Sequence, residues 1–167
     1  LTVTEAVGID ISQLHLEQAK AAVPSAEFQV DSLVEPKMFC GRTFDVVTCL
    51  GTLSLFDDLL TPMRHLMEKV ASGGSLYIFD LLNPEPVDVL MRYRTTGESA
   101  GPWRPAFNVR CRQTWMEAAH EADINCRVEF TDFRISIDIP KTDNPMRAWT
   151  ELREGHGRQI MVGRDSY

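Results

Sequence analysis

Acidic residues follow three short apolar runs in the first half of the chain. Asp10 follows VGI, Asp31 follows EFQV, and Asp80 follows LYIF. In an open parallel sheet the carboxyl ends of the strands meet at one edge, and ligands bind in the crevice beyond that edge. A carboxylate at such an edge is well suited to accept hydrogen bonds from the two hydroxyls of a ribose. The pattern indicates a nucleotide-binding edge, although each acidic residue taken alone could equally cap a helix or face water.

The segments around these acids alternate between strand and helix. The apolar and β-branched runs at 7–9, 27–30, 44–50 and 76–80 are typical of buried strands. We expect one helix at 12–22 with Ser12 as its N-cap, and another from Thr61-Pro62 that Gly73-Gly74 would end. Alternating strands and helices predict an α/β fold, with a Rossmann-like, mostly parallel sheet and helices on both faces.

The periodicity changes to two residues after Asn83-Pro84-Glu85-Pro86. Alternating apolar residues at 107–115 and 124–130 predict an antiparallel β-hairpin that turns near 118–123, with a bulge near 131–132 and a further strand to residue 139. Residues 1–84 would then form a partial cofactor-binding core, and residues 85–167 a substrate-covering extension of the same domain. Such a hairpin, or the exposed sheet edges, could also serve a homodimer.

The composition narrows the possible partners and the location of the protein. A net charge of −7 argues against a nucleic acid or an anionic lipid surface as the partner. The sequence shows neither a signal peptide nor an apolar run long enough to span a bilayer, which favours a cytoplasmic protein. The four cysteines form no Cys-x-x-Cys pair, so we interpret Cys49 and Cys111 as buried thiols and expect no metal site.

Residues 6–84 resemble the class I S-adenosylmethionine-dependent methyltransferases, entered partway through the motif order of that family. VGIDIS is similar to the second-strand motif and EFQVDSL to the third-strand motif. FDVVTCLGTLSLFDD is similar to the fourth-strand motif, and VASGGSLYIFDLLNP to the glycine turn and fifth strand. Four motifs in family order, over about half of the chain, are more specific than any one of them.

The resemblance implies S-adenosylmethionine as the cofactor and assigns residues to it. The ribose of the adenosine would be bound by one acidic residue, the adenine would lie against the residues beside it and after the next strand, and the methionine end would pass the backbone after the fourth-strand motif. The resemblance assigns Asp10 to the ribose. It assigns Ile11, Asp31 and Ser32 to the adenine, and Cys49, Leu50 and Gly51 to the methionine end.

The chain also departs from the family pattern at both ends. The family signature is a glycine-rich loop after the first strand, and nothing before Ala6 can supply it. The missing strand would lie between the strands that end at Asp10 and Cys49, so both of those edges would lack a partner. The family also ends with a helix and two further strands. We therefore expect an internal fragment or an incomplete reading frame, with a permuted or dimer-completed fold as the alternative.

The resulting hypothesis is a methyltransferase whose parent protein moves a methyl group from S-adenosylmethionine to a small molecule, because the segment 103–134 occupies the region that selects the substrate in this family. No catalytic base can be named, although Asp80 could orient a substrate. A nicotinamide-dependent oxidoreductase shares the acidic residue at Asp10 and remains an alternative. A degenerate or oligomerising module without enzymatic activity is a second alternative, favoured by the absent glycine loop.

Overall fold

The computed structural model describes residues 3–37, 41–97, 100–131, 133, 135–142, 149–155 and 157–161. The chain forms two compact units, Leu1–Val128 and Glu129–Tyr167. Strands β1 to β8 and helices α1, α2 and α3 belong to the first unit, and strands β9 and β10 belong to the second.

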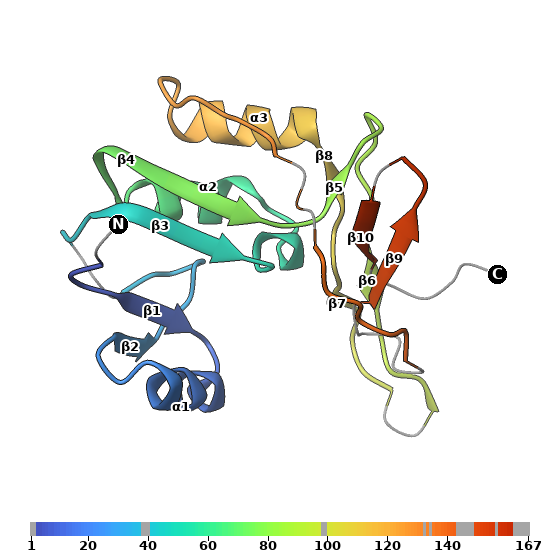
Figure 1. Ribbon diagram of the computed structural model, residues 1–167, viewed down its shortest axis with the longest axis horizontal. Coiled ribbons are helices and arrows are strands. Elements are labelled where there is room, and N and C mark those ends of the chain that lie inside the picture. Colours follow the sequence, from blue (N-terminus) through green and yellow to red (C-terminus); the bar gives the residue numbers. More distant parts are fainter. Residues whose placement is uncertain are drawn as a thin grey trace. The chain divides into compact units, whose positions relative to one another are not determined.

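The chain begins with a strand–helix–strand motif, β1 (Val7–Asp10), α1 (Gln13–Ala22) and β2 (Glu27–Val30) (Figure 1). The two strands are parallel and in register, with Asp10 opposite Val30. The Ser12 hydroxyl accepts a hydrogen bond from His15 N at 3.4 Å, which confirms Ser12 as the N-cap. Both strands therefore deliver their carboxyl ends to the same edge, as the sequence pattern predicts.

A second parallel pair consists of β3 (Phe44–Leu50) and β4 (Val70–Phe79), connected through the 3-10 turn η1 (Leu53–Leu55) and helix α2 (Leu60–Met67). The prediction that Thr61 caps α2 was wrong. The N-cap residue is Leu59, and Thr61 lies inside the helix. The carboxylate of Asp58, one residue before the N-cap, accepts hydrogen bonds from Leu60 N at 2.9 Å and Thr61 N at 3.3 Å.

The prediction that Gly73-Gly74 ends α2 was also wrong, because the helix ends at Met67 and both glycines lie within β4. The register between β3 and β4 shifts at this point. Phe44 is opposite Val70, but Val46 is opposite Ser75, so β4 carries a bulge. Gly73 has a φ of +77°, which glycine adopts without steric cost, so its role in a bulge replaces the expected role as a helix cap.

The α/β arrangement with parallel strand pairs agrees with the prediction, but the sheets are small. Strands β1 and β2 form one two-stranded sheet, and strands β3 and β4 form another. Within the described part of the chain, neither β1 nor β3 has a second hydrogen-bonded partner.

The predicted hairpin over residues 107–130 was wrong. The structure has a helix, α3 (Arg112–Ala122), where the second half of the first strand and the turn were expected. The buried residues Cys111, Trp115 and Ala119 recur every four residues, which is the spacing of one helix face. Strand pairing here is limited to short segments: β5 (Leu82–Asn83) pairs with β8 (Arg110–Cys111), and β6 (Arg92–Tyr93) with β7 (Arg104–Pro105).

Helices α2 and α3 pack against each other and carry much of the apolar core of the first unit. Met63 of α2 is 1% exposed and Trp115 of α3 is 5% exposed, while Leu53 of η1 is fully buried. The predicted burial of the thiols of Cys49 and Cys111 is confirmed.

The second unit contains an antiparallel pair, β9 (Trp149–Arg153) and β10 (Gly157–Met161). Thr150 N donates to the Ile139 carbonyl at 2.9 Å, and Ile139 N donates to the Thr150 hydroxyl at 2.9 Å. These two bonds hold the segment before residue 140 beside β9. In the residues that the structure describes, no helix is long and apolar enough to cross a membrane.

Candidate functional site

The carboxyl ends of β1 and β2 bring two of the predicted acidic residues together. Asp31 N donates to the Asp10 carbonyl at 3.1 Å, so the two residues are neighbours across the strand pair. The Asp10 Oδ1 accepts from Ser12 N at 2.7 Å, and Oδ2 lies 3.7 Å from His15 Nδ1. The Asp10 side chain is 41% exposed. A carboxylate held in place by one backbone amide and open to solvent retains lone pairs for the hydroxyls of a ligand.

The carboxylate of Asp31 organises the turn that follows β2. Its Oδ1 accepts from Ser32 N at 2.8 Å and from Lys37 N at 3.2 Å, and its Oδ2 accepts from Lys37 N at 3.1 Å. The Ser32 hydroxyl in turn accepts from Val34 N at 3.2 Å. The turn beside Asp10 is therefore fixed by side-chain hydrogen bonds to the backbone rather than by strand pairing.

The predicted residues after the fourth-strand motif lie at the carboxyl end of β3. Gly51 N donates to the Phe79 carbonyl at 2.7 Å, and Gly51 has a φ of +67°. Apart from Gly51 itself and its two chain neighbours, no atom lies within 4 Å of the position that a Cβ on Gly51 would occupy, so the backbone is open on that side. A ligand could therefore approach the main chain at Gly51.

Cys49 is not suited to act as a nucleophile. It is 5% exposed, and burial raises the pKa of its thiol to about 11. The thiolate is the reactive form of cysteine, so this side chain stays a neutral packing group near pH 7. The contribution of this segment to a ligand would come from its backbone.

Two of the predicted residues project apolar side chains into solvent at these strand ends. Ile11 is 78% exposed and Leu50 is 67% exposed. Exposed aliphatic groups beside a carboxylate and an open glycine fit a ligand that combines a flat apolar base with a ribose. The seven predicted residues fall into two groups, one at the β1–β2 edge and one at the end of β3.

The loop after β3 is fixed by a buried polar network that sequence reasoning missed. The Asp80 carboxylate accepts from Ser54 N at 2.9 Å, and the Ser54 carbonyl accepts from Asn108 N at 2.7 Å. The Asn108 side chain is 1% exposed, and its amide donates to the Phe56 carbonyl at 3.0 Å. Asp80 therefore serves the structure of the loop through this hydrogen bond to Ser54 N.

Arg110 is the second residue that the sequence did not reveal. Arg110 lies out of phase with the apolar residues of the alternating run at 107–115, yet it is 3% exposed. Its Nη2 donates to the carbonyls of Phe56 at 2.6 Å and Asp57 at 2.8 Å. A buried guanidinium that holds main-chain carbonyls more than fifty residues away leaves no local pattern in the sequence.

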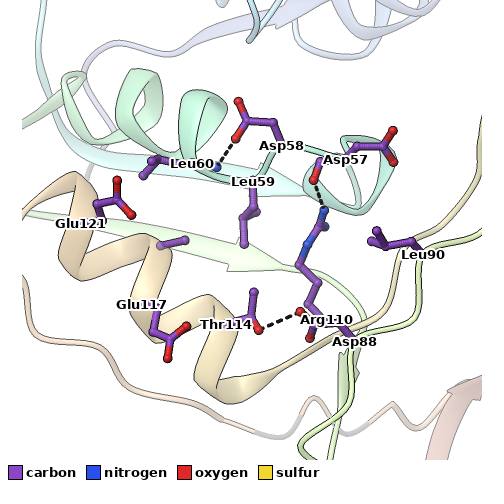
Figure 2. A pocket seen from close by; sticks show the side chains of 11 residues that line it. Asp57, Asp58, Leu59, Leu60, Asp88, Leu90, Arg110, Thr114, Glu117 and Glu121 are labelled. Atoms are coloured by element: carbon purple, nitrogen blue, oxygen red, sulfur yellow. Dashed lines mark hydrogen bonds between the residues drawn. The ribbon is translucent and has the colours of Figure 1, made fainter.

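A cavity of about 350 Å³ lies beside this network, between the start of α2 and helix α3 (Figure 2). Residues 57–60 form one wall and the exposed turns of α3 form the other. The polar groups that line it are five carboxylates, one hydroxyl and one guanidinium: Asp57, Asp58, Asp88, Glu117, Glu121, Thr114 and Arg110.

The comparison with protein families identifies the class of this fold. Residues 1–78 match the model of a methyltransferase domain. That segment contains β1, β2, β3 and most of β4, and all seven predicted cofactor residues lie in it, within these strands or directly after them. Residues 1–78 are therefore similar to a methyltransferase domain, and the α/β Rossmann-like fold is that of S-adenosylmethionine-dependent methyltransferases.

Solved structures with a similar fold have low sequence identity to this chain. A DhpI structure in complex with SAH has a TM-score of 0.52 and 19% identity, covering 71% of this chain and 56% of that chain. An S-adenosylmethionine-dependent methyltransferase from Clostridium acetobutylicum has a TM-score of 0.53 and 11% identity, covering 96% and 76%. The sugar N-methyltransferase KedS8 from a Streptoalloteichus species has a TM-score of 0.51 and 13% identity, covering 96% and 71%.

The chain thus spans little more than half of the length of the DhpI chain. No curated protein matches the sequence of this chain closely. The similarities establish the fold, and they support a methyltransferase rather than the alternative of a nicotinamide-dependent oxidoreductase.

Proposed function

We propose that this protein takes part in the transfer of a methyl group from S-adenosylmethionine to a small molecule. The observation that carries the proposal is the pair of acidic residues at the adjoining carboxyl ends of β1 and β2, within the segment that matches the methyltransferase family. The cofactor supplies an electrophilic methyl group on a sulfonium, and its transfer to a nucleophile leaves S-adenosylhomocysteine and a proton. Such a displacement depends mainly on positioning, so no catalytic base needs to be assigned.

In this proposal Asp10 accepts hydrogen bonds from the ribose hydroxyls, and Ile11, Asp31 and Ser32 border the adenine. The backbone at Cys49, Leu50 and Gly51 borders the methionine end. The carboxylate of Asp10 keeps one oxygen on Ser12 N, and its remaining lone pairs are available to a ligand. The open side of Gly51 is consistent with close approach of a ligand to the main chain.

A small acceptor is supported by two observations. The sugar N-methyltransferase KedS8 shares the fold, and the first unit has a cavity of a size suited to a small molecule. In the proposed organisation, residues 1–84 form a partial cofactor-binding core, while residues 85–167 cover and select the substrate. A cytoplasmic location is part of the same proposal.

The assembly of the complete site is also a proposal. Strands β1 and β3 each have one hydrogen-bonded partner among the described strands, so each has an edge that a further strand could pair with. We propose that such a strand, from a segment of the parent protein or from a homodimer partner, joins these edges and supplies the glycine-rich loop. The hairpin expected at 107–130 no longer supports a dimer, because α3 occupies that segment.

Calorimetric titration of S-adenosylhomocysteine into the purified chain, with NAD as the comparison ligand, tests the proposed cofactor site. The variant Asp10→Asn keeps an oxygen for Ser12 N but removes the charge, so we expect a roughly 10- to 100-fold weaker affinity from the loss of a charge-assisted hydrogen bond. The matched control is Asp45→Asn, near the amino end of β3.

Equal losses in the two variants, or equal binding of NAD and S-adenosylhomocysteine, would contradict the proposed role of Asp10. If the folded chain binds neither ligand, the alternative of a degenerate module without enzymatic activity is favoured.

A further inference from the structure

The cavity between the start of α2 and α3 has an excess of negative charge. Five carboxylates line it. Two of them are paired with arginines outside its lining, because Arg92 lies 2.5 Å from Asp57 and Arg64 lies 3.2 Å from Glu121. With Arg110, three guanidiniums face five carboxylates, which leaves a formal charge of −2. A cationic group would be attracted into this space.

The carboxylates of Asp58 and Asp88 stay ionised near pH 7. A hydrogen bond from the Thr61 hydroxyl lowers the pKa of Asp58. Burial raises the pKa of Asp88, but hydrogen bonds from Cys111 N at 2.7 Å and from the Thr114 hydroxyl at 2.8 Å outweigh burial and hold it below its ordinary value. The negative charge of the cavity is therefore fixed by local hydrogen bonds.

A second and independent feature of the cavity is an unsatisfied donor. Arg110 lines the cavity and is 3% exposed, and its Nη2 is used by the carbonyls of Phe56 and Asp57. Its Nη1 is buried and has no hydrogen-bond partner. Leaving a buried charged donor unpaired is costly, so an acceptor oxygen from a ligand or a water is expected there. Figure 2 shows Arg110 extending from β8 toward the Asp57 backbone, between the two walls.

The size of the cavity limits the ligand. A volume of about 350 Å³ is near the lower end of the range for small-molecule sites. At about 30 Å³ for each water-sized group, it has room for roughly ten to twelve non-hydrogen atoms. A monosaccharide or an amino acid has this size.

The cavity is connected to the proposed methyl-transfer edge by one short loop. Gly51 at the end of β3 begins this loop, and Asp58 at the cavity ends it. Between them, Ser54 links the loop to Asp80 at the end of β4 and to Asn108. A ligand in the cavity would therefore contact the segment that also borders the proposed methionine end of the cofactor.

We propose that this cavity recognises the methyl acceptor, and that the acceptor is a small, oxygen-bearing amine whose ammonium group lies among the carboxylates and whose oxygen accepts from Arg110. The assignment of this ligand as the acceptor rests on the proposed methyltransferase function. The binding of such an amine does not.

D-Glucosamine and D-glucose are a matched pair of probes, because they differ only in an amine that replaces one hydroxyl. Titrations followed by two-dimensional amide NMR, below the pKa of the glucosamine amine, should give a dissociation constant in the millimolar range for glucosamine, as expected for about twelve atoms. Glucose should bind about tenfold more weakly. The preference should shrink as salt is raised, since the attraction is partly exposed to solvent.

Glu117 and Glu17 provide a matched pair of variants. Glu117 accepts from Gln113 at 2.8 Å on α3 and lines the cavity, and Glu17 accepts from Gln13 at 3.1 Å on α1 and does not line it. Glu117→Gln should weaken glucosamine binding several-fold without changing glucose binding, and Glu17→Gln should change neither. Arg110→Lys keeps the charge but has a single ammonium nitrogen in place of the guanidinium, so it should weaken the binding of both sugars.

Equal affinity for the two sugars, absence of binding to the folded chain, or equal effects of the two glutamate variants would overturn the proposal. Titration of S-adenosylhomocysteine on the same samples separates the two hypotheses. If S-adenosylhomocysteine binds and glucosamine does not, the proposed amine site fails and the methyltransferase proposal stands. If the result is the reverse, the amine site stands and the methyltransferase proposal fails.

Discussion

The substitution Asn108→Ala tests whether the loop between β3 and α2 depends on one buried amide. Asn108 is 1% exposed. Its Oδ1 accepts from Met91 N at 2.9 Å, and its Nδ2 donates to the Phe56 carbonyl at 3.0 Å and to Asp57 Oδ1 at 3.3 Å. One side chain therefore joins the loop to the segment that contains β6.

The expected cost of Asn108→Ala follows from the partners that lose a hydrogen bond. Met91 N loses the acceptor that Asn108 supplies, which costs about 1–3 kcal/mol for a buried donor. The Phe56 carbonyl still accepts from Arg110, and Asp57 can turn to water, so these two add little. The space left by the amide adds about 1 kcal/mol, for a total of about 2–4 kcal/mol.

Urea unfolding followed by circular dichroism measures this loss. With a slope of about 2 kcal/mol per molar urea, the middle of the usual range, the midpoint should fall by about 1–2 M. Asn125→Ala, at an exposed residue, is the control and should change stability by less than about 0.5 kcal/mol. Asn108→Asp keeps an acceptor for Met91 N but places a buried carboxylate beside Asp57, so it should be at least as destabilising. A loss below about 1 kcal/mol in Asn108→Ala would refute the assigned role of the amide.

Three further predictions concern single residues near the site. The buried residues Cys49 and Cys111 should react with a thiol reagent only after unfolding, whereas the partly exposed Cys126 should react first of these three. Mass spectrometry of the labelled peptides checks this order. Early labelling of Cys49 would contradict its burial and its thiol pKa of about 11. Asp58→Ala should cost about 1 kcal/mol by removing the carboxylate that accepts from two amides in the first turn of α2. Because the pKa of Asp58 is lowered in the folded state, its contribution to stability is present above about pH 4 and is lost as pH falls further. The stability of Asp58→Asn should therefore depend less on pH in that acidic range. Urea unfolding of both proteins at pH 3 and pH 6 measures this, and the same pH dependence in the two would contradict the role of the carboxylate. Gly51→Ala should destabilise the folded state by about 1 kcal/mol through the positive φ alone, because the added Cβ would lie in open space. Thermal unfolding measures this loss. A loss of several kcal/mol would show that the space is not open.

The strand–helix–strand elements of the first eighty residues were predictable because their signals are local. Ser12 caps α1 within three residues, and the apolar run of β3 ends directly at Leu50. The position of Asp10 at a strand end follows from the same short pattern. Such features depend on neighbours in the sequence, which is all that a single sequence displays.

Helix α3 was missed because its start was interpreted with a period of two. Phe107, Val109 and Cys111 alternate, but Cys111, Trp115 and Ala119 are four residues apart and all are buried from the helix start onward. The good helix formers at 116–119 and 121–122 favour a helix there. A count of both periods over the whole segment would have favoured the helix from Cys111 onward.

The cavity and its polar network were not predictable from local pattern. Arg110 is joined to the carbonyl of Phe56, and Asn108 to that of Ser54, across more than fifty residues of chain. Nothing beside Arg110 in the sequence indicates that it is buried. In the sequence, Asp57 and Asp58 were recognised only as the last two residues of the fourth-strand motif. Their position in the wall of the cavity depends on α3, which the sequence analysis did not predict.

The central claim is that the carboxyl ends of β1, β2 and β3 bind the cofactor. Amide NMR of the isotope-labelled chain during titration with S-adenosylhomocysteine tests it most directly. Saturable shifts at the amides of Ile11, Ser32 and Gly51, with Thr150 and Leu152 of β9 unchanged, are the predicted result. Saturable shifts confined to residues away from these three strand ends, or an unchanged spectrum of the folded chain, would contradict the account.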